Sequence, residues 1–205
     1  MINNYNQLPV GRYLEICDVI RNDALDEVER QSQIIGILAG IPAGDVLNLP
    51  LMEYTALAAS SRFLEQELPK PTIAPSKAVK LGDLVLVPTV DLQKMTAAQY
   101  VDFQTMCTGK EDQIVPLLST LLVPKGCAYC QEYDVADVQK AIADKMPVAH
   151  AVALLAFFFK RWSASIASLH TYCDALLKVT KTLQPRKAKK IQAALSARAG
   201  AGSTV

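Results

Sequence analysis

The sequence has few of the residues that usually carry catalysis or build extracellular scaffolds. Among 205 residues there are two histidines, one tryptophan and five cysteines. An odd number of irregularly spaced cysteines argues against a secreted disulfide framework and favours a reducing compartment. The sequence also has no Walker loop, no dinucleotide fingerprint, no Gly-x-Ser-x-Gly and no His-Glu-x-x-His motif. These absences argue against an enzyme.

Long apolar runs are also missing. The most apolar stretch, 148–159, is about a dozen residues long, whereas a membrane-spanning helix needs roughly twenty. Residues 1–8 contain neither a basic cluster nor an apolar run, so we expect no secretion signal. The sequence therefore predicts a soluble intracellular protein with no membrane partner.

The composition is that of a globular protein with a strongly polarised charge. Hydrophobic residues make up 51% and charged residues 20%, which excludes wholesale disorder. From Leu176 onward there are seven basic residues and no acid, which leaves fourteen basic and twenty acidic residues before it, a net charge of −6. The chain then divides into a helical domain with a hairpin insertion, 1–181, and a basic, partly flexible tail, 182–205. The charged residues of this tail are Arg186, Lys187, Lys189, Lys190 and Arg198.

Such a tail has several interpretations. It either keeps the protein soluble, folds back on the acidic body, or reaches an acidic partner or nucleic acid. The tail lacks the interleaved aromatic residues that stack on bases, and the rest of the chain is acidic. Nucleic acid is therefore the least favoured of these partners.

Helical periodicity and cap residues predict a mainly α-helical single domain. We expect Asp23 to cap a helix that ends at Gly40, and Thr96 and Gln99 to form a capping box in which each side chain binds a backbone N–H. Asp134 is expected to cap a later helix. The other predicted helices are a short one around 13–20, where a strand is the alternative, one between Asn48 and Pro69, and a leucine-rich one over 114–122.

One segment predicts β-structure. Two short apolar runs flank Gly82-Asp83, and glycine supplies the positive φ that the first position of a tight turn requires. We therefore predict one small β-hairpin at about 77–88, packed on helices or on another subunit, because isolated hairpins are marginally stable.

The last predicted helix is the longest. It opens at Pro147 and runs to around Lys181, and its apolar residues recur at steps of three and four. These are Leu154, Phe158, Trp162, Ile166, Leu169, Cys173 and Leu177. Phe157, Phe158 and Phe159 are consecutive, so they spread over more than half of the helix circumference. Either the core encloses this helix, or one phenylalanine is left for a partner; the candidate partner-binding residues are Phe157, Phe158, Phe159 and Trp162.

Cys127-Ala-Tyr-Cys130 is the one motif with reactive chemistry. It lies in a predicted loop, without the strand before it or the helix after it that a thioredoxin-type site needs. A zinc site needs two further ligands, and His150 and His170 are about 30 Å apart along one helix. We therefore expect no metal and no cofactor.

The order of elements resembles that of a known family. A helical N-terminal half leads into the proline-bounded hairpin, and the segments that follow are Asp91-Leu-Gln-Lys-Met-Thr-Ala-Ala-Gln-Tyr-Val-Asp-Phe-Gln104, Leu121-Leu-Val-Pro-Lys-Gly126, Tyr133-Asp-Val-Ala-Asp-Val138 and the aromatic-rich last helix. From about Ile34 to Phe159 the chain resembles small bacteriophage proteins described as tail assembly chaperones. The family pattern usually has small or polar residues around Gly126 to Gln131, where this chain has two cysteines.

The resemblance implies a non-enzymatic protein of the host cell cytoplasm. Such a protein binds tape-measure or tail-tube subunits during tail morphogenesis and keeps them soluble, and it is a possible homo-oligomer. An alternative is a structural virion component, a head, neck or tail protein that stays in the particle.

Overall fold

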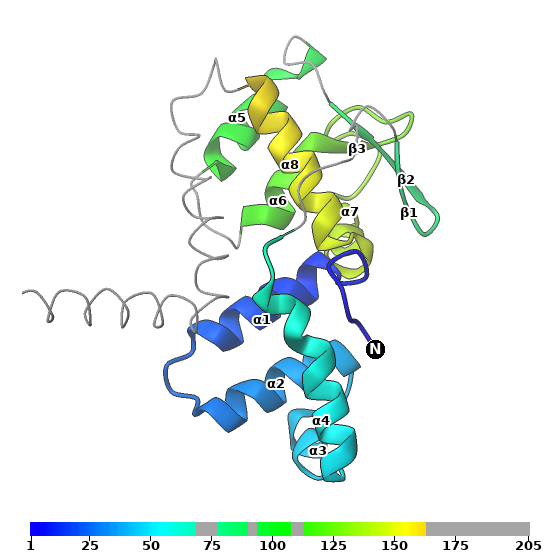
Figure 1. Ribbon diagram of the computed structural model, residues 1–205. Helices are drawn as coiled ribbons and strands as arrows, with labels where there is room; N and C mark the ends of the chain where they lie inside the picture. Colours follow the sequence, from blue (N-terminus) through cyan, green and yellow to red (C-terminus); the bar gives the residue numbers. More distant parts are fainter. Residues whose placement is uncertain (69–77, 90–93, 108–112, 163–205) are drawn as a thin grey trace, which may run out of the picture.

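The computed structural model describes residues 1–68, 78–89, 94–107 and 113–162 (Figure 1). These residues form eight α-helices, one 3₁₀ helix and a three-stranded antiparallel sheet. The prediction of a mainly α-helical fold with a small β-element is confirmed. No helix in the described ranges is both long enough and apolar enough to cross a membrane.

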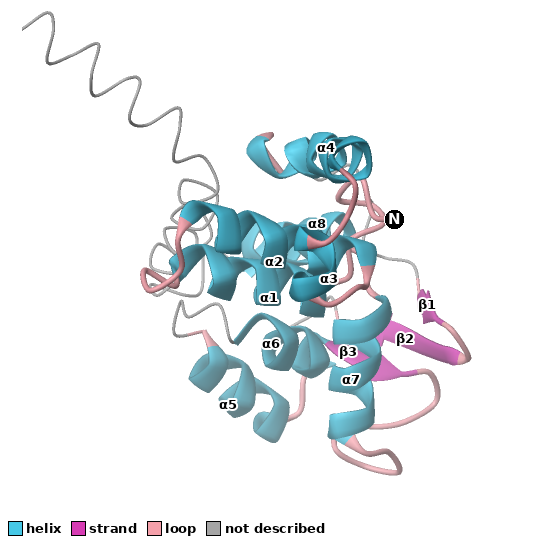
Figure 2. Ribbon diagram, turned by 90° about the horizontal axis from the view of Figure 1, so that it is seen from below, coloured by secondary structure: helices cyan, strands magenta, loops and turns pink. Residues whose placement is uncertain are grey.

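The N-terminal half contains only helices. It comprises α1 (Val10–Arg21), α2 (Glu27–Ala39), α3 (Ala43–Leu47), α4 (Leu51–Ser60) and the 3₁₀ helix η1 (Ser61–Glu65). α1 packs on α2, and α2 packs on α3 and α4. In both overall views α4 lies at the opposite end of the molecule from α5, the helix that follows the hairpin (Figures 1 and 2).

The C-terminal half combines helices with the sheet. It comprises β1 (Val79–Leu81), β2 (Leu84–Pro88), α5 (Ala97–Met106), α6 (Ile114–Leu121), β3 (Leu122–Pro124), α7 (Val135–Lys145) and α8 (Val148–Trp162). The predicted continuation of α8 to around Lys181 lies outside the described residues. A two-residue antiparallel bridge between Pro9 and Pro147 ties the N-terminus to the junction of α7 and α8.

The predicted hairpin is confirmed, and a third strand completes it. β1 and β2 pair around a turn in which Gly82 has a φ of +66°. Leu122, expected at the end of the leucine-rich helix, instead opens β3 (Leu122–Pro124), which pairs with β2. α6 ends at Leu121 because Pro124 lies just ahead and the open edge of β2 offers backbone partners.

The core is continuous across both halves. Its largest fully buried side chains come from both halves of the described residues, among them Leu8, Ile16, Leu38, Leu86, Phe103, Leu117, Leu121 and Phe158. α7 contributes Val138 and Ile142. The described residues therefore pack around one hydrophobic cluster.

The predicted cap of α2 was placed one turn too early. Asp26, not Asp23, is the N-cap: its carboxylate accepts the Glu29 N–H at 2.8 Å, and the Glu29 carboxylate accepts the Asp26 N–H at 3.1 Å. A capping box needs Glu or Gln three residues after the cap, and only Asp26 has one. Leu25, which was expected on this helix, precedes it.

The predicted capping box of α5 is half present. The Thr96 hydroxyl accepts the Gln99 N–H at 3.1 Å, as expected. The Gln99 side chain, however, is buried and donates to the Thr120 carbonyl at 2.6 Å and to the Thr89 hydroxyl at 3.2 Å. It therefore joins α5 to the end of α6 and to the residue after β2.

Candidate protein-binding surface

Helix α4 is unusual because none of its residues is buried. Leu51 is 76% exposed and Met52 85% exposed, and the neighbouring Leu47 at the end of α3 is 53% exposed. An isolated exposed leucine is ordinary on protein surfaces, but a whole helix without a buried residue is not. We therefore take α4 as the starting point for a functional site.

The outward side of α4 carries no charge. At 100° per residue, the exposed positions other than Glu53 gather on one side of the helix. Together with Leu47 we call them the α4 surface: Leu47, Leu51, Met52, Thr55, Ala56 and Ala59. Large apolar side chains at one end and small ones at the other would let another helix approach closely.

Both ends of α4 are anchored although the helix itself is not buried. Before it, Val46 in α3 is fully buried. After it, Phe63 and Leu64 of η1 are buried, and the Phe63 ring meets the Tyr5 ring edge-on at a centroid distance of 5.1 Å. The Tyr5 hydroxyl donates to the Leu64 carbonyl at 3.3 Å, and burial raises the pKa of this phenol to about 12. These buried residues fix both ends of α4 to the rest of the protein.

The turn between α2 and α3 fixes the position of α3. Gly40 ends α2 in the left-handed conformation, with a φ of +72°. A Cβ at Gly36 would lie 2.7 Å from the Ile41 carbonyl oxygen, so the chain turns directly against the helix. Because glycine alone permits this approach, the turn sets where the α4 surface begins.

The segment that contains α4 is acidic. Asp45, Glu53, Glu65 and Glu67 are exposed in it, against one exposed base, Arg62. Within the described ranges none of these five side chains forms an ion pair. These four acids, which we call the acidic rim, outnumber the base, and residues 43–68 carry a net charge of −3.

A second apolar area lies on α5. Tyr100 is 40% exposed and Val101 59% exposed. The charges in residues 94–107 are one lysine and one aspartate, Lys94 and Asp102, so this area has no net charge. It is smaller than the α4 surface, and it differs from it in having no acidic rim.

The phenylalanines predicted to bind a partner have different positions. Phe158 and Phe159 are buried in the core, with exposed fractions of 0% and 4%. Phe157 is half-buried and packs against the core edge-on to Phe158, at a centroid distance of 5.8 Å. Phe158 and Phe159 therefore fit the alternative in which the core encloses the helix. Trp162 is the last residue of α8 in the structure, and its side chain is not among the described groups.

The basic tail lies outside the described residues. Its five charged residues, Arg186, Lys187, Lys189, Lys190 and Arg198, remain known from the sequence alone. Their role as a partner-binding element stays a prediction.

Cys127 and Cys130 lie in the loop between β3 and α7. The first is half-buried and the second exposed, and both thiols are free. Tyr129 between them is buried, its hydroxyl donates to the Asp102 carboxylate at 2.8 Å, and burial raises the pKa of this phenol above its usual value. The described residues contain no cluster of three or more His, Cys, Asp or Glu side chains that could hold a metal ion.

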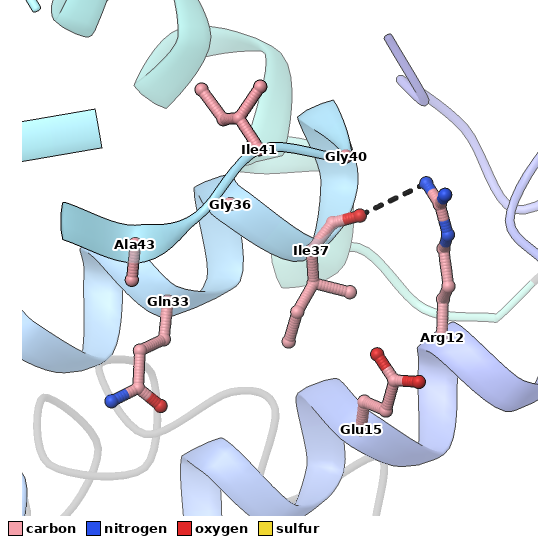
Figure 3. A pocket seen from close by; sticks show the side chains of 8 residues that line it. All are labelled: Arg12, Glu15, Gln33, Gly36, Ile37, Gly40, Ile41 and Ala43. Carbon is pink, nitrogen blue, oxygen red and sulfur yellow. Dashed lines mark hydrogen bonds between the residues drawn. The ribbon is translucent and has the colours of Figure 1, made fainter. Parts of the chain in front are cut away.

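An open pocket of about 340 Å³ lies between α1 and the end of α2 (Figure 3). Arg12 points toward the α2 terminus, where its Nη1 donates to the Ile37 carbonyl at 3.1 Å (Figure 3). A cation at a helix C-terminus compensates the helix dipole and occupies an otherwise unpaired carbonyl. The arginine has a structural role there, and the pocket identifies no ligand.

Comparisons with known proteins identify no relative: no protein-family model, no curated protein and no solved structure matches the chain.

The α4 surface was not among the sites predicted from the sequence, which predicted only a helix between Asn48 and Pro69 here. A signal was present, because the ten residues of α4 contain a single charge, Glu53, and have apolar residues on both sides. A surface helix normally has charged and polar residues on its outer side.

Proposed function

We propose that this protein is a non-enzymatic assembly factor that binds an apolar helical segment of another protein, as a bacteriophage tail assembly chaperone would bind a tape-measure or tail-tube subunit. The observation that supports the proposal is the α4 surface, an uncharged and exposed helical side held in place at both ends. The phage context rests on the sequence resemblance from about Ile34 to Phe159.

The chemistry of the α4 surface suits such a client. An amphipathic helix binds by laying its apolar side on an apolar helical surface. Methionine adapts to clients of different shape, because its side chain is flexible and polarisable. The acidic rim, formed by Asp45, Glu53, Glu65 and Glu67, would select client helices with basic flanks and would repel acidic ones.

The test is co-expression with a candidate client, followed by measurement of the soluble client fraction. Met52→Asp places a charge among the large apolar side chains of the α4 surface, and we expect it to abolish the gain in client solubility. Val28→Asp is the matched control, because Val28 is 57% exposed on α2, outside the α4 surface. If Met52→Asp and Val28→Asp behave alike, the α4 surface does not bind the client.

A second measurement distinguishes an assembly chaperone from a structural component of the virion. Purified virus particles are examined for the chain by mass spectrometry. A chaperone is expected in infected cells and not in finished particles, whereas the structural alternative requires the chain in the particle at a fixed stoichiometry.

A further inference from the structure

We propose that Cys127 and Cys130 form a site of reversible thiol oxidation, at which a small-molecule disulfide such as glutathione disulfide converts the two thiols into an internal disulfide bond. The site lies between β3, which ends at Pro124, and α7, which begins at Val135. It involves no residue of the α4 surface, and it is independent of the function proposed above.

The loop that carries the two thiols is tied to the rest of the fold at two points. The Lys125 N–H donates to the Val85 carbonyl of β2 at 2.8 Å. The Tyr129 hydroxyl donates to the Asp102 carboxylate of α5 at 2.8 Å, and the Tyr129 side chain is buried. The loop therefore has a defined shape, and it presents the cysteines on either side of Tyr129 in a defined arrangement.

The turn brings the two cysteines together. Cys127 comes directly before a turn in which the Gln131 N–H donates to the Ala128 carbonyl at 3.0 Å, and Cys130 is a central residue of that turn. The Cys130 N–H donates to the Tyr133 hydroxyl at 3.2 Å. Burial raises the pKa of this phenol, and negative charge on Cys130 or Cys127 raises it further, so both thiols lie near the same hydroxyl. Two thiols in this arrangement need only small movements of the loop to reach disulfide geometry.

The backbone at Cys130 adopts a conformation that cysteine does not favour. Cys130 has a φ of +54° and Glu132 a φ of +62°, and no other non-glycine residue in the described ranges has a positive φ. Glycine or asparagine would adopt this conformation at lower cost. The Cys130 side chain is exposed, so packing does not offset the cost. A role for the thiol itself accounts for a cysteine at this position.

The difference in exposure assigns a role to each thiol, because Cys130 is exposed and Cys127 is half-buried. The Cys130 thiolate attacks one sulfur of glutathione disulfide, whose S–S bond breaks, and one glutathione leaves as a thiolate. The Cys127 thiolate then attacks the Cys130 sulfur of this mixed disulfide and displaces the second glutathione. The protein gives up two electrons and two protons, and one glutathione disulfide becomes two glutathione thiols.

The site differs from that of a thioredoxin-type enzyme. In such an enzyme the reactive cysteine lies at a helix N-terminus, whereas here the N-cap of α7 is Asp134, which follows both cysteines. The pair is therefore a target of oxidation and not a catalyst of thiol exchange in other proteins. Cys17 and Cys107 are buried, so they serve as internal controls in the same molecule.

Equilibration of the full-length protein with glutathione measures the reaction. After acid quenching and blocking of the remaining thiols, trypsin releases residues 126–140, a peptide that contains both cysteines. An internal disulfide leaves this peptide unblocked and about 2 Da lighter than the dithiol. At about 1 mM glutathione disulfide and about 1 mM glutathione, we expect at least half of the pair to be oxidised, whereas Cys17 and Cys107 stay reduced.

The same equilibrium in about 8 M urea is the reference for an unfolded chain. We expect the equilibrium constant for disulfide formation to be at least about threefold larger in the folded protein, because the turn holds the two thiols near each other. By the same linkage, the oxidised protein should have a higher urea midpoint than the reduced protein.

Cys127→Ser and Cys130→Ser are a matched pair of variants that tests the two roles. Cys127→Ser leaves the mixed disulfide without an attacking thiol, so glutathione should accumulate on Cys130. Cys130→Ser removes the exposed thiol, and we expect Cys127 to capture glutathione at least about fivefold more slowly. Circular dichroism and the urea midpoint of the reduced variants confirm that both are folded.

Three results would overturn the proposal: glutathione bound to residues 126–140 with no internal disulfide, an internal disulfide that is equally favourable in urea, and a disulfide that joins two copies and increases with protein concentration. Equal rates of glutathione capture by the two variants would overturn the roles assigned to the thiols. Client binding takes no part in these measurements, so their outcome leaves the proposed function to its own test.

Discussion

Substitution of Gln99 distinguishes two roles for this residue. The sequence pattern predicts that its side chain reaches back to the Thr96 N–H in a capping box, whereas in the structure it donates to the Thr120 carbonyl at 2.6 Å. Thr120 is in the last turn of α6, where carbonyls have no partner within the helix. The Thr89 N–H binds the next carbonyl, of Leu121, at 2.8 Å. Gln99 and Thr89 therefore supply the hydrogen-bond donors for the last two carbonyls of α6.

The expected magnitude follows from burial. Gln99 is 2% exposed, so Gln99→Met keeps most of the volume and leaves the Thr120 carbonyl buried without its donor. An unsatisfied buried acceptor costs about 1–3 kcal/mol, and the lost bond to Thr89 adds about 0.5–1 kcal/mol. We expect Gln99→Met to lower the free energy of unfolding by about 2–3 kcal/mol. With a urea m-value of about 2 kcal/mol/M, the midpoint should fall by about 1–1.5 M.

Gln99→Glu gives the result that separates the two roles. Glutamate is a preferred residue at the third position of a capping box, so the sequence-based role predicts a stable variant. In the structure, a buried carboxylate would lack the donor and face a carbonyl oxygen, which predicts a larger loss than Gln99→Met. The loss should shrink at low pH, because a protonated acid can donate. A Gln99→Glu variant as stable as the unmodified protein would refute the contact with Thr120.

Three further predictions concern the core and the titratable groups. Phe158→Ala should lower the free energy of unfolding by about 3–5 kcal/mol, and Phe157→Ala by about half of that or less, because Phe158 is fully buried and Phe157 is not. Urea denaturation measures both losses, and equal losses would contradict the different burial of the two side chains. At pH 8, iodoacetamide should label Cys17 and Cys107 at least about tenfold more slowly than Cys127 and Cys130. The reason is that burial raises the pKa of the Cys17 thiol to about 11 and that of the Cys107 thiol to about 12. Equal labelling of all four thiols, measured by mass spectrometry, would contradict this prediction. Burial lowers the pKa of the His150 imidazole, so the unfolded chain binds a proton at higher pH than the folded protein does. The melting temperature should therefore fall as the pH drops below about 6.5. His150→Gln should reduce this fall, and a variant with an unchanged pH profile would contradict the prediction.

Local sequence signals were sufficient for most helices and for the hairpin. Asp134 caps α7 as expected, with its carboxylate accepting the Ala136 N–H at 2.8 Å. Pro116 is tolerated because it lies in the first turn of α6, and Gly82 has the positive φ that the turn requires. Each of these features depends on residues within four positions of one another, so the sequence shows it directly.

The missed features depend on long-range contacts. β3 forms because residues 122–124 meet β2, more than thirty positions earlier in the chain. Gln99 binds Thr120, twenty-one positions away, in preference to its own helix terminus. Phe158 and Phe157 are adjacent in sequence, yet only the packing of α8 decides that Phe158 is fully buried. Periodicity gives the faces of a helix, but it does not tell which face meets the core when both are apolar.

The stability of the fold does not explain the residues on the outside of α4. A ten-residue helix is too short to be stable alone, so α4 depends on its anchors, Val46 before it and Phe63 and Leu64 after it. Leu51 and Met52 bury too little surface to contribute much of this stability, since 76% and 85% of their surfaces remain exposed. A polar residue at either position would serve the fold equally well and would improve solubility. An apolar side chain there is of use only when another helix covers it, which is the state that the proposed client would provide.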